Sequence, residues 1–137
     1  MSKCGQKRQD CRRGFPMENT TATELYAQVY RQWQEVVELG LHESEDIVNG
    51  IMPPLARALS LEPDYLPALD LLSDLLMELG AYEEAVELVE RMLVLCPDDP
   101  GYRGKLDALA GEGNRRRSIR AYLHQKRQQV LSRVVAR

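Results

Sequence analysis

The sequence predicts an all-α protein built from antiparallel helical hairpins, and three observations support this fold class. First, apolar residues recur at steps of three and four along most of the chain, which is the spacing of one face of an α-helix. Second, glycine and proline residues separate these segments, as expected where a helix ends and the chain turns back. Third, part of the sequence repeats: a shift of 34 residues superposes Leu59, Leu61 and Pro63-Asp64 on Leu93, Leu95 and Pro97-Asp98.

Residues 1–19 form a basic, polar tail before the first helical pattern. This tail has few large apolar side chains and cannot bury enough surface to offset chain entropy, so we expect it to be disordered. Cys4 and Cys11 lie within it, but no histidine or second cysteine pair accompanies them, so the four ligands of a structural zinc site are missing. The sequence leaves open whether Met1 or Met17 is the true start.

The first hairpin is predicted over 20–63 and is irregular. Thr21 and Glu24 have the spacing of a capping box, and the helix that they begin has an apolar face formed by Leu25, Val29, Trp33, Val36 and Val37. A polar insertion, LHESED, follows Gly40, and Ser44 within it can cap a short turn. Pro53-Pro54 oppose regular helix, so we expect a kink or a new helix start at Pro53.

The best-defined hairpin is predicted over 64–97, with its turn at Gly80-Ala81. Gly80 can adopt the left-handed conformation that ends a helix, and Glu83-Glu84 then lie in the first turn of the next helix, where the macrodipole favours negative charge. The first helix has an apolar stripe of Leu69, Leu72, Leu75, Leu76 and Leu79. The second helix has a matching stripe of Ala85, Val86, Val89, Met92, Leu93 and Val94.

A last hairpin with a cover helix is predicted over 98–137. Asp98 or Asp99 can cap a helix that has Pro100 at its first position. We expect the inward face of this helix to be formed by Leu106, Leu109 and Ala110, and Gly111 and Gly113 to end it. Asn114 can cap the final helix, in which Lys126 interrupts an apolar stripe of Ile119, Tyr122, Leu123, Val130 and Val134.

Within the central hairpin, the spacing Leu69-x2-Leu72-Ser73-x2-Leu76, then Ala85-x3-Val89, then Pro97, resembles the tetratricopeptide repeat signature. Ala85 and Pro97 match outright, whereas leucine or valine stands at positions 69, 76 and 89, where the family usually has tryptophan, tyrosine and phenylalanine. The resemblance covers 66–97 and extends more loosely over 51–123. It implies a short α-solenoid of stacked hairpins with a C-terminal capping helix, and a single helical domain over 20–137.

The resemblance also implies a function, because tetratricopeptide repeats are protein-interaction modules. In that family the first helix of each hairpin lines a concave groove that holds a peptide, and the matching outward positions here are Asp70, Asp74, Met77 and Glu78. Such a groove is acidic, and it lacks the lysine, arginine and asparagine of the family's carboxylate clamp. The implied role is a scaffold or chaperone that binds a basic or amphipathic segment of a protein partner.

The charge distribution suggests two further functions. The net charge of −3 conceals basic ends, +4 over 1–17 and +8 over 114–137, which flank an acidic middle of −15. The basic C-terminal helix can therefore meet the acidic middle of the same copy or of another copy, which in the second case makes a homo-oligomer. Nucleic acid is the other candidate partner, through Arg115, Arg116, Arg117 and Arg120, but the acidic middle repels phosphate and no recognised nucleic-acid motif is present.

The sequence favours no enzyme, no cofactor and no metal. It contains no nucleophile elbow, zinc-binding HExxH, paired CxxC or nucleotide fingerprint, and no nucleophile accompanies the Asp70 and Asp74 carboxylates for acid–base chemistry. No stretch of 18 residues lacks charge, so no membrane-spanning helix is expected. The basic N-terminus has no apolar segment after it and three cysteines make no disulfide framework, so we expect a cytoplasmic protein.

Overall fold

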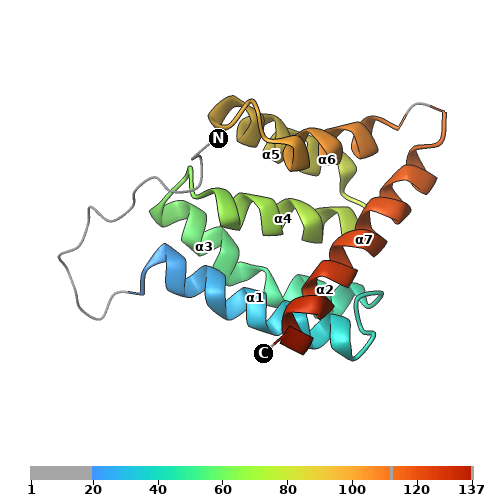
Figure 1. Cartoon of the computed structure of the whole chain (residues 1–137). Helices are drawn as coiled ribbons and strands as arrows, with labels where there is room; N and C mark the ends of the chain where they lie inside the picture. Colours follow the sequence, from blue (N-terminus) through green and yellow to red (C-terminus); the bar gives the residue numbers. More distant parts are fainter. Residues whose placement is uncertain (1–19, 112, 137) are drawn as a thin grey trace.

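The computed structural model describes residues 20–111 and 113–136, and the regular secondary structure in these ranges is entirely α-helical (Figure 1). The helices in chain order are α1 (Ala22–Glu38), α2 (Glu45–Ile51), α3 (Pro53–Leu61), α4 (Leu66–Glu78), α5 (Tyr82–Leu95), α6 (Pro100–Ala110) and α7 (Arg115–Ala136). The all-α prediction is confirmed.

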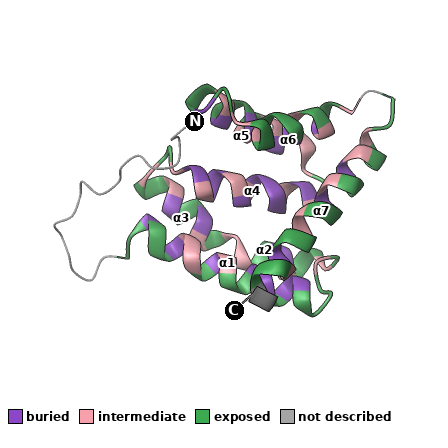
Figure 2. Cartoon of the chain, viewed as in Figure 1, coloured by how far each residue is buried: buried purple, intermediate pink, exposed green. Residues whose placement is uncertain are grey.

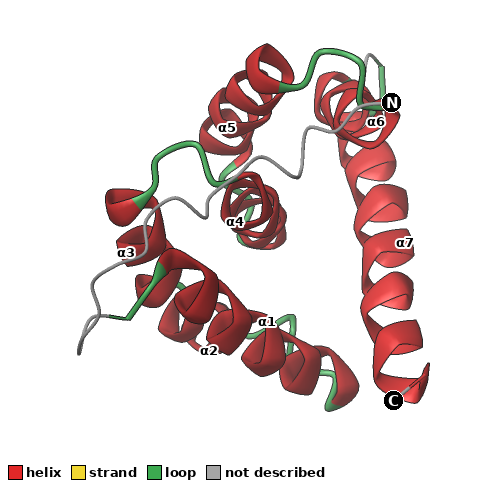
Figure 3. Cartoon of the chain, turned by 60° about the vertical axis from the view of Figure 1, so that its left-hand side comes forward, coloured by secondary structure: helices red, strands yellow, loops and turns green. Residues whose placement is uncertain are grey.

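The helices pack as hairpins that stack on one another. In the first hairpin α1 packs against α3, in the second α4 packs against α5, and in the third α6 packs against α7. Contacts of α4 with α1 and α3, and of α5 with α6, join neighbouring hairpins, which confirms the predicted stack. Helix α7 continues beyond α6 and also contacts α4 and α1, so it lies alongside all three hairpins (Figure 3).

The start of the first hairpin is as the sequence predicts. Thr21 Oγ1 accepts a hydrogen bond from the Glu24 amide at 3.1 Å, and Glu24 Oε1 accepts one from the Thr21 amide at 3.0 Å, which completes the capping box. The predicted apolar face of α1 is buried throughout. Helix α2 ends at Ile51 and α3 begins at Pro53, so the two prolines start a new helix.

Helix α4 is the central helix, and its neighbours cover it on more than one side (Figure 3). Helix α4 contributes Ala68, Leu71 and Leu75 to one apolar cluster, which it shares with α1 and α3. It contributes Leu66, Leu69 and Met77 to a second cluster, which it shares with α5, α6 and α7. The sequence predicted a single apolar face for this helix, and that expectation is wrong because α4 has packing partners on both sides (Figure 2).

The predicted turns and caps of the last two hairpins are present. Gly80 has a φ of 82°, the left-handed value that favours glycine after a helix. Asp99 Oδ1 accepts hydrogen bonds from the amides of Gly101 and Tyr102, and Asn114 Oδ1 accepts one from the Arg117 amide. These side chains satisfy backbone donors that have no partner within their own helices.

The inward faces of α6 and α7 differ in part from the prediction. In α6 the buried side chains are Lys105 and Leu109, whereas Ala110, which was expected to face inward, is exposed. In α7 Ile119, Leu123 and Val130 are buried as predicted. A lysine can occupy the buried position 105 because acidic side chains of α4 lie against it, as described below.

Several expectations fall on residues 1–19, including the tail's disorder, the alternative start and the two cysteines there, and these lie outside the described residues. Cys96, the third cysteine, is buried at the end of α5. Among the described residues, no helix combines the length and the apolar character needed to cross a membrane.

Candidate functional site

The four residues predicted to line an acidic groove lie together on α4, and most of their surface is covered. Met77 and Asp74 have relative exposures of 1% and 6%. The side chain of Glu78 is 6% exposed and that of Asp70 is 32% exposed. We call Asp70, Asp74 and Glu78 the acidic face of α4, and the covering side chains come from α6 and α7.

Lys105 of α6 is completely buried against this face. Its Nζ donates hydrogen bonds to Asp70 Oδ1 at 2.6 Å, to the Asp70 carbonyl oxygen at 3.0 Å and to Ser73 Oγ at 2.7 Å. The same nitrogen lies 2.8 Å from Asp74 Oδ1. One turn of α4 therefore provides a cradle of oxygen atoms that compensates for the lost hydration of a buried ammonium group.

Lys126 of α7 reaches the same two carboxylates from the other side. Its Nζ lies 2.9 Å from Asp74 Oδ2 and 3.5 Å from Asp70 Oδ2. Each aspartate thus contacts Lys105 through one oxygen and Lys126 through the other. Lys126 also donates to the Tyr122 hydroxyl at 3.3 Å, and both lysine nitrogens lie within 6 Å of the Tyr122 ring centroid, at 5.8 Å for Lys105 and 5.5 Å for Lys126.

Within the cluster of two lysines and two aspartates, the surroundings of Asp70 and Lys126 favour their charged forms. Burial would raise the pKa of Asp70, but the charges and hydrogen bonds of Lys105 and Lys126 outweigh it and hold that pKa below its ordinary value. Burial would lower the pKa of Lys126, whereas Asp74 and Asp70 raise it above its ordinary value. Neither group titrates near neutral pH, so neither is suited to serve as a general acid or base there.

A second ion pair continues the contact between α4 and α7. Arg127 Nη1 donates to Glu78 Oε2 at 2.6 Å. Burial raises the pKa of Glu78, and the hydrogen bond and charge of Arg127 offset this only in part. Further along α7, Arg133 Nη1 donates to the Tyr30 hydroxyl of α1 at 3.2 Å, with its guanidinium carbon 5.6 Å from the ring centroid. Basic side chains therefore attach α7 to both α4 and α1.

Sequence reasoning missed Lys105, Lys126 and Arg127 as members of the site. A signal for Lys126 was present, because this lysine interrupts the apolar stripe of the last helix and so falls on its buried side. Lys105 likewise takes a buried position beside Leu109 on a short helix. A charged residue in an apolar stripe requires a partner of opposite charge. The acidic face of α4 provides these partners, Asp70 for Lys105 and Asp74 for Lys126.

A groove of about 640 Å³ lies between α6 and α7, and we call it the α6–α7 groove. Small residues line much of it, namely Gly101, Gly104, Ala108, Ser118 and Ala121. Its larger lining side chains include Tyr102, Tyr122, Asp107 and Lys126, and Asp70 of α4 also reaches it. Of the four residues predicted for the acidic groove, Asp70 alone lines this hollow. The uncovered edge of the acidic face thus opens into the α6–α7 groove.

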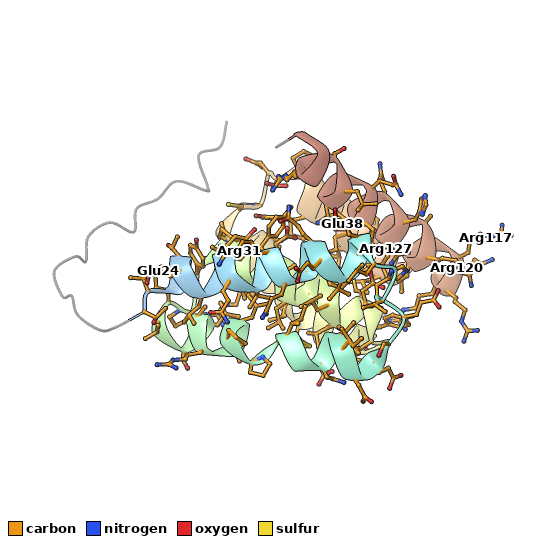
Figure 4. All side chains as sticks on the ribbon, turned by 90° about the horizontal axis from the view of Figure 1, so that it is seen from below. Glu24, Arg31, Glu38, Arg117, Arg120 and Arg127 are labelled. Atoms are coloured by element: carbon orange, nitrogen blue, oxygen red, sulfur yellow. The ribbon has the colours of Figure 1, made fainter. Side chains whose placement is uncertain are left out.

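The four arginines predicted as a basic surface lie in the first two turns of α7. Arg115 is half-buried, donates from Nε to the Leu109 carbonyl at 2.8 Å, and lies 3.6 Å from Glu83 of α5. Arg116, Arg117 and Arg120 are exposed. Figure 4 shows Arg117 and Arg120 at the outer end of α7, away from Arg127.

The described residues include no group of three or more histidine, cysteine or acidic side chains that could hold a metal ion. The acidic carboxylates of the site are instead matched by lysine and arginine. The arrangement is therefore suited to binding basic side chains through charge and hydrogen bonds.

The comparison with protein families agrees with the hairpin geometry. Residues 66–109, which span α4, α5 and α6 and include Lys105 with its two aspartates, match the family described as tetratricopeptide repeat. Neither the curated proteins nor the solved structures provide a match. The match covers the whole of the closer resemblance, residues 66–97, and continues to residue 109 within the looser range of 51–123. The chain is thus a small helical protein that contains a tetratricopeptide repeat over residues 66–109.

Proposed function

We propose that this protein is a non-enzymatic interaction module, a scaffold or chaperone, that binds a basic or amphipathic segment of a partner protein at the acidic face of α4 and the adjoining α6–α7 groove. A tetratricopeptide repeat suggests protein–protein interaction in general. The observation that carries the finer proposal is that the acidic face already holds a basic helix, α7, through Lys126 and Arg127. A cytoplasmic location is part of this proposal.

The α6–α7 groove has features that suit a peptide. Gly104 has open space on its side-chain side, with no atom within 4 Å of an added Cβ, so a partner chain can approach the α6 backbone closely. Two tyrosine rings offer apolar and stacking surface, and Asp107 is an exposed carboxylate with no ion pair among the described residues. A basic side chain in this groove can therefore pair with Asp107 and lie against Tyr102 or Tyr122.

Blocking this groove tests the proposal. Gly104→Trp fills the hollow from an exposed position, while Gly104→Ala is the matched control that leaves it open. Affinity capture from cell extract with the wild-type chain, followed by mass spectrometry, identifies the partner, and binding is then measured with the purified partner. We expect Gly104→Trp to weaken that binding at least tenfold and Gly104→Ala to leave it unchanged. Equal binding by both variants, with unchanged circular dichroism, contradicts the proposal.

Asp70 and Asp74 are unsuitable as first targets for such a test. Because both carboxylates neutralise the buried Lys105, replacing either with lysine places like charges together in the core. Loss of binding in those variants then reports loss of folding as well as loss of contact. Asp107→Lys avoids the difficulty because this residue is exposed, and it is expected to weaken a basic partner's binding more at low salt than at high salt.

Self-association is a second candidate, and a specific contact favours it. The pairing of α7 with α4 uses only residues of this chain, so the α7 of another copy carries the same complementary groups. Light scattering over a range of protein concentrations tests for such an oligomer, and a constant monomer mass excludes it. Nucleic acid is less favoured, because Arg115 of the basic surface is engaged with the Leu109 carbonyl and Glu83, and the acidic middle of the chain repels phosphate.

A further inference from the structure

We propose that α7 is a resident and exchangeable occupant of the acidic face, and that the partner segment is a helix that carries an adjacent Lys-Arg pair flanked by apolar residues, as α7 does. This inference rests on the proposed function, because it assigns the partner chemistry and the regulation to the same face of α4. A partner helix binds this face by taking the place of Lys126 and Arg127 after the distal half of α7 has moved away.

The charge balance of the covered face supports this assignment. Asp70, Asp74 and Glu78 carry three negative charges, and the buried Lys105 of α6 neutralises one of them. Lys126 and Arg127 supply the remaining two positive charges from neighbouring positions on α7. When α7 leaves, Lys105 stays, and the face is left with two unmatched negative charges one turn apart. An incoming segment must therefore bring two positive charges at a similar separation.

The attachment of α7 is stronger at its start than further along. At the start, Arg115 is bonded to the Leu109 carbonyl and lies 5.2 Å from the Tyr82 ring centroid, and Ile119 and Leu123 are buried. Beyond Leu123, α7 is joined to α4 and α1 by the ion pairs of Lys126 and Arg127 and by one hydrogen bond to Tyr30, and its apolar packing there comes from Val130, which is buried, and Leu131, which is partly buried. Because these ion pairs are largely buried, the cost of removing the charges from water offsets much of their attraction, so they contribute little net stability. The second half of α7 is thus the part that can exchange.

The sequence of α7 describes the helix that fits. Leu123 lies three residues before Lys126, and Val130 lies three residues after Arg127, so both apolar side chains fall near the side of the helix that carries the basic pair. The apolar residues enter the two clusters of the core, and the basic pair meets the carboxylates. The partner class is a basic amphipathic helix with this spacing, and its binding excludes α7 from the face.

A synthetic peptide of residues 114–136 carrying a fluorescent label serves as the external helix. Its binding is measured by fluorescence anisotropy with three full-length chains: the wild type, Lys126→Ala with Arg127→Ala, and Arg116→Ala with Arg117→Ala. The last chain is the matched control, because it loses the same charge from the same helix at exposed positions. We expect the Lys126/Arg127 variant to bind the peptide at least tenfold more tightly than the wild type, and the control to bind it as the wild type does.

A second peptide with Lys126→Ala and Arg127→Ala identifies the contact. We expect this second peptide to bind the Lys126/Arg127 variant no more tightly than it binds the wild-type chain. We also expect high salt to remove the tighter binding of the wild-type peptide to that variant. Two results overturn the proposal: the Lys126/Arg127 variant binds both peptides with the same affinity, or it binds neither peptide more tightly than the wild-type chain does. In either case α7 is a fixed part of the fold. The proposed function survives that result, because binding in the α6–α7 groove is tested separately through Gly104→Trp.

Hydrogen exchange on the wild-type chain keeps the test informative if the double variant does not fold. Exchange through opening of α7 predicts that amides of 124–131 exchange at least tenfold faster than those in the middle of α4, with the ratio rising as salt is added. Equal protection of the two helices at low and high salt overturns the proposal.

Discussion

At the scale of single residues, Lys105 shows how a charge can be part of a protein core. A lysine without exposed surface loses its hydration, which is costly unless oxygen atoms replace the water. Here two carboxylates, a carbonyl and a hydroxyl of α4 replace it, all from residues 70–74. The lysine consequently ties α6 to α4, and it fixes the side chains that α7 also contacts.

Replacing Lys105 with methionine is expected to lower the free energy of unfolding by about 3–5 kcal/mol, because Asp70 and Asp74 are left as neighbouring carboxylates with only Lys126 beside them. Urea unfolding followed by circular dichroism measures the change. The control is Arg91→Met, which removes an exposed ion pair with Asp64 and is expected to cost at most about 1 kcal/mol. A similar loss for both variants would show that the Lys105 cluster is no stronger than a surface pair.

The acid limit of stability is expected to depend on Asp70. Its pKa is below the ordinary value in the folded chain, so ionised Asp70 stabilises the fold at pH values above about 4, and this stabilisation is lost as the pH falls through the folded pKa. Glu78 acts in the opposite sense, because burial raises its pKa and its protonation in acid relieves that cost. Comparing the wild type with Asp70→Asn separates the two residues.

Melting temperatures measured for both chains between pH 2 and pH 8 test this. The wild type is expected to melt at higher temperature than Asp70→Asn at pH 7, and the two curves are expected to converge as the pH falls through the lowered pKa of Asp70. A difference that is constant with pH would mean that the charge of Asp70 does not contribute to stability.

At the scale of elements, the glycines differ in what their positions require. Gly80 ends α4 with a φ of 82°, a conformation that side-chain-bearing residues adopt at a cost. Gly104 lies inside α6 with open space beside it, where glycine only weakens the helix. Both are glycines of the tetratricopeptide segment, yet the first is needed for the turn and the second leaves room in the α6–α7 groove.

Alanine at the two positions is therefore expected to have opposite effects. Gly80→Ala should destabilise the fold by about 1 kcal/mol because of its left-handed backbone. Gly104→Ala should stabilise it by about 0.5–1 kcal/mol through higher helix propensity. Thermal unfolding of the two variants provides the measurement, and a change of the same sign in both would contradict this account of the turn.

Most element boundaries were predictable because their signals are local. The capping box at Thr21, the helix start at Pro53 and the turn at Gly80 depend on residues within a few positions of one another. The exposure of each helix face was less predictable. Asp74 and Met77 were expected to point outward. Instead, Lys105 of α6 and Lys126 of α7 cover Asp74, and Met77 is buried in the cluster shared with α5, α6 and α7.

At the scale of the whole molecule, α4 connects the two apolar clusters of the core. The cluster around α1 and α3 contains the single tryptophan, Trp33, and the other cluster gathers α5, α6 and α7. Leu59 packs against both clusters, and α4 contributes buried residues to each. The described helices therefore share one continuous core, and the hairpins are not independent units.

One cooperative unfolding transition is expected from this continuity. Trp33 fluorescence reports on the first cluster and far-ultraviolet circular dichroism on all helices, so the two signals should have the same midpoint in urea. Substituting Leu75 with alanine, at the centre of α4, should lower the free energy of unfolding by about 2–5 kcal/mol. Both midpoints should then move to the same lower urea concentration. Separate midpoints would show that the first hairpin unfolds on its own.

The sequence by itself determined the helices, their turns and the stacking of hairpins, since these follow from apolar spacing and from glycine, proline and capping residues within short segments. It also showed that an acidic middle is followed by a basic final helix. Only the tertiary structure decided that these two parts meet, with Lys105 and Lys126 sharing the oxygens of Asp70 and Asp74. The reason is physical: residues 35 and 56 positions beyond Asp70 become its partners only through the path of the folded chain, which no local pattern contains.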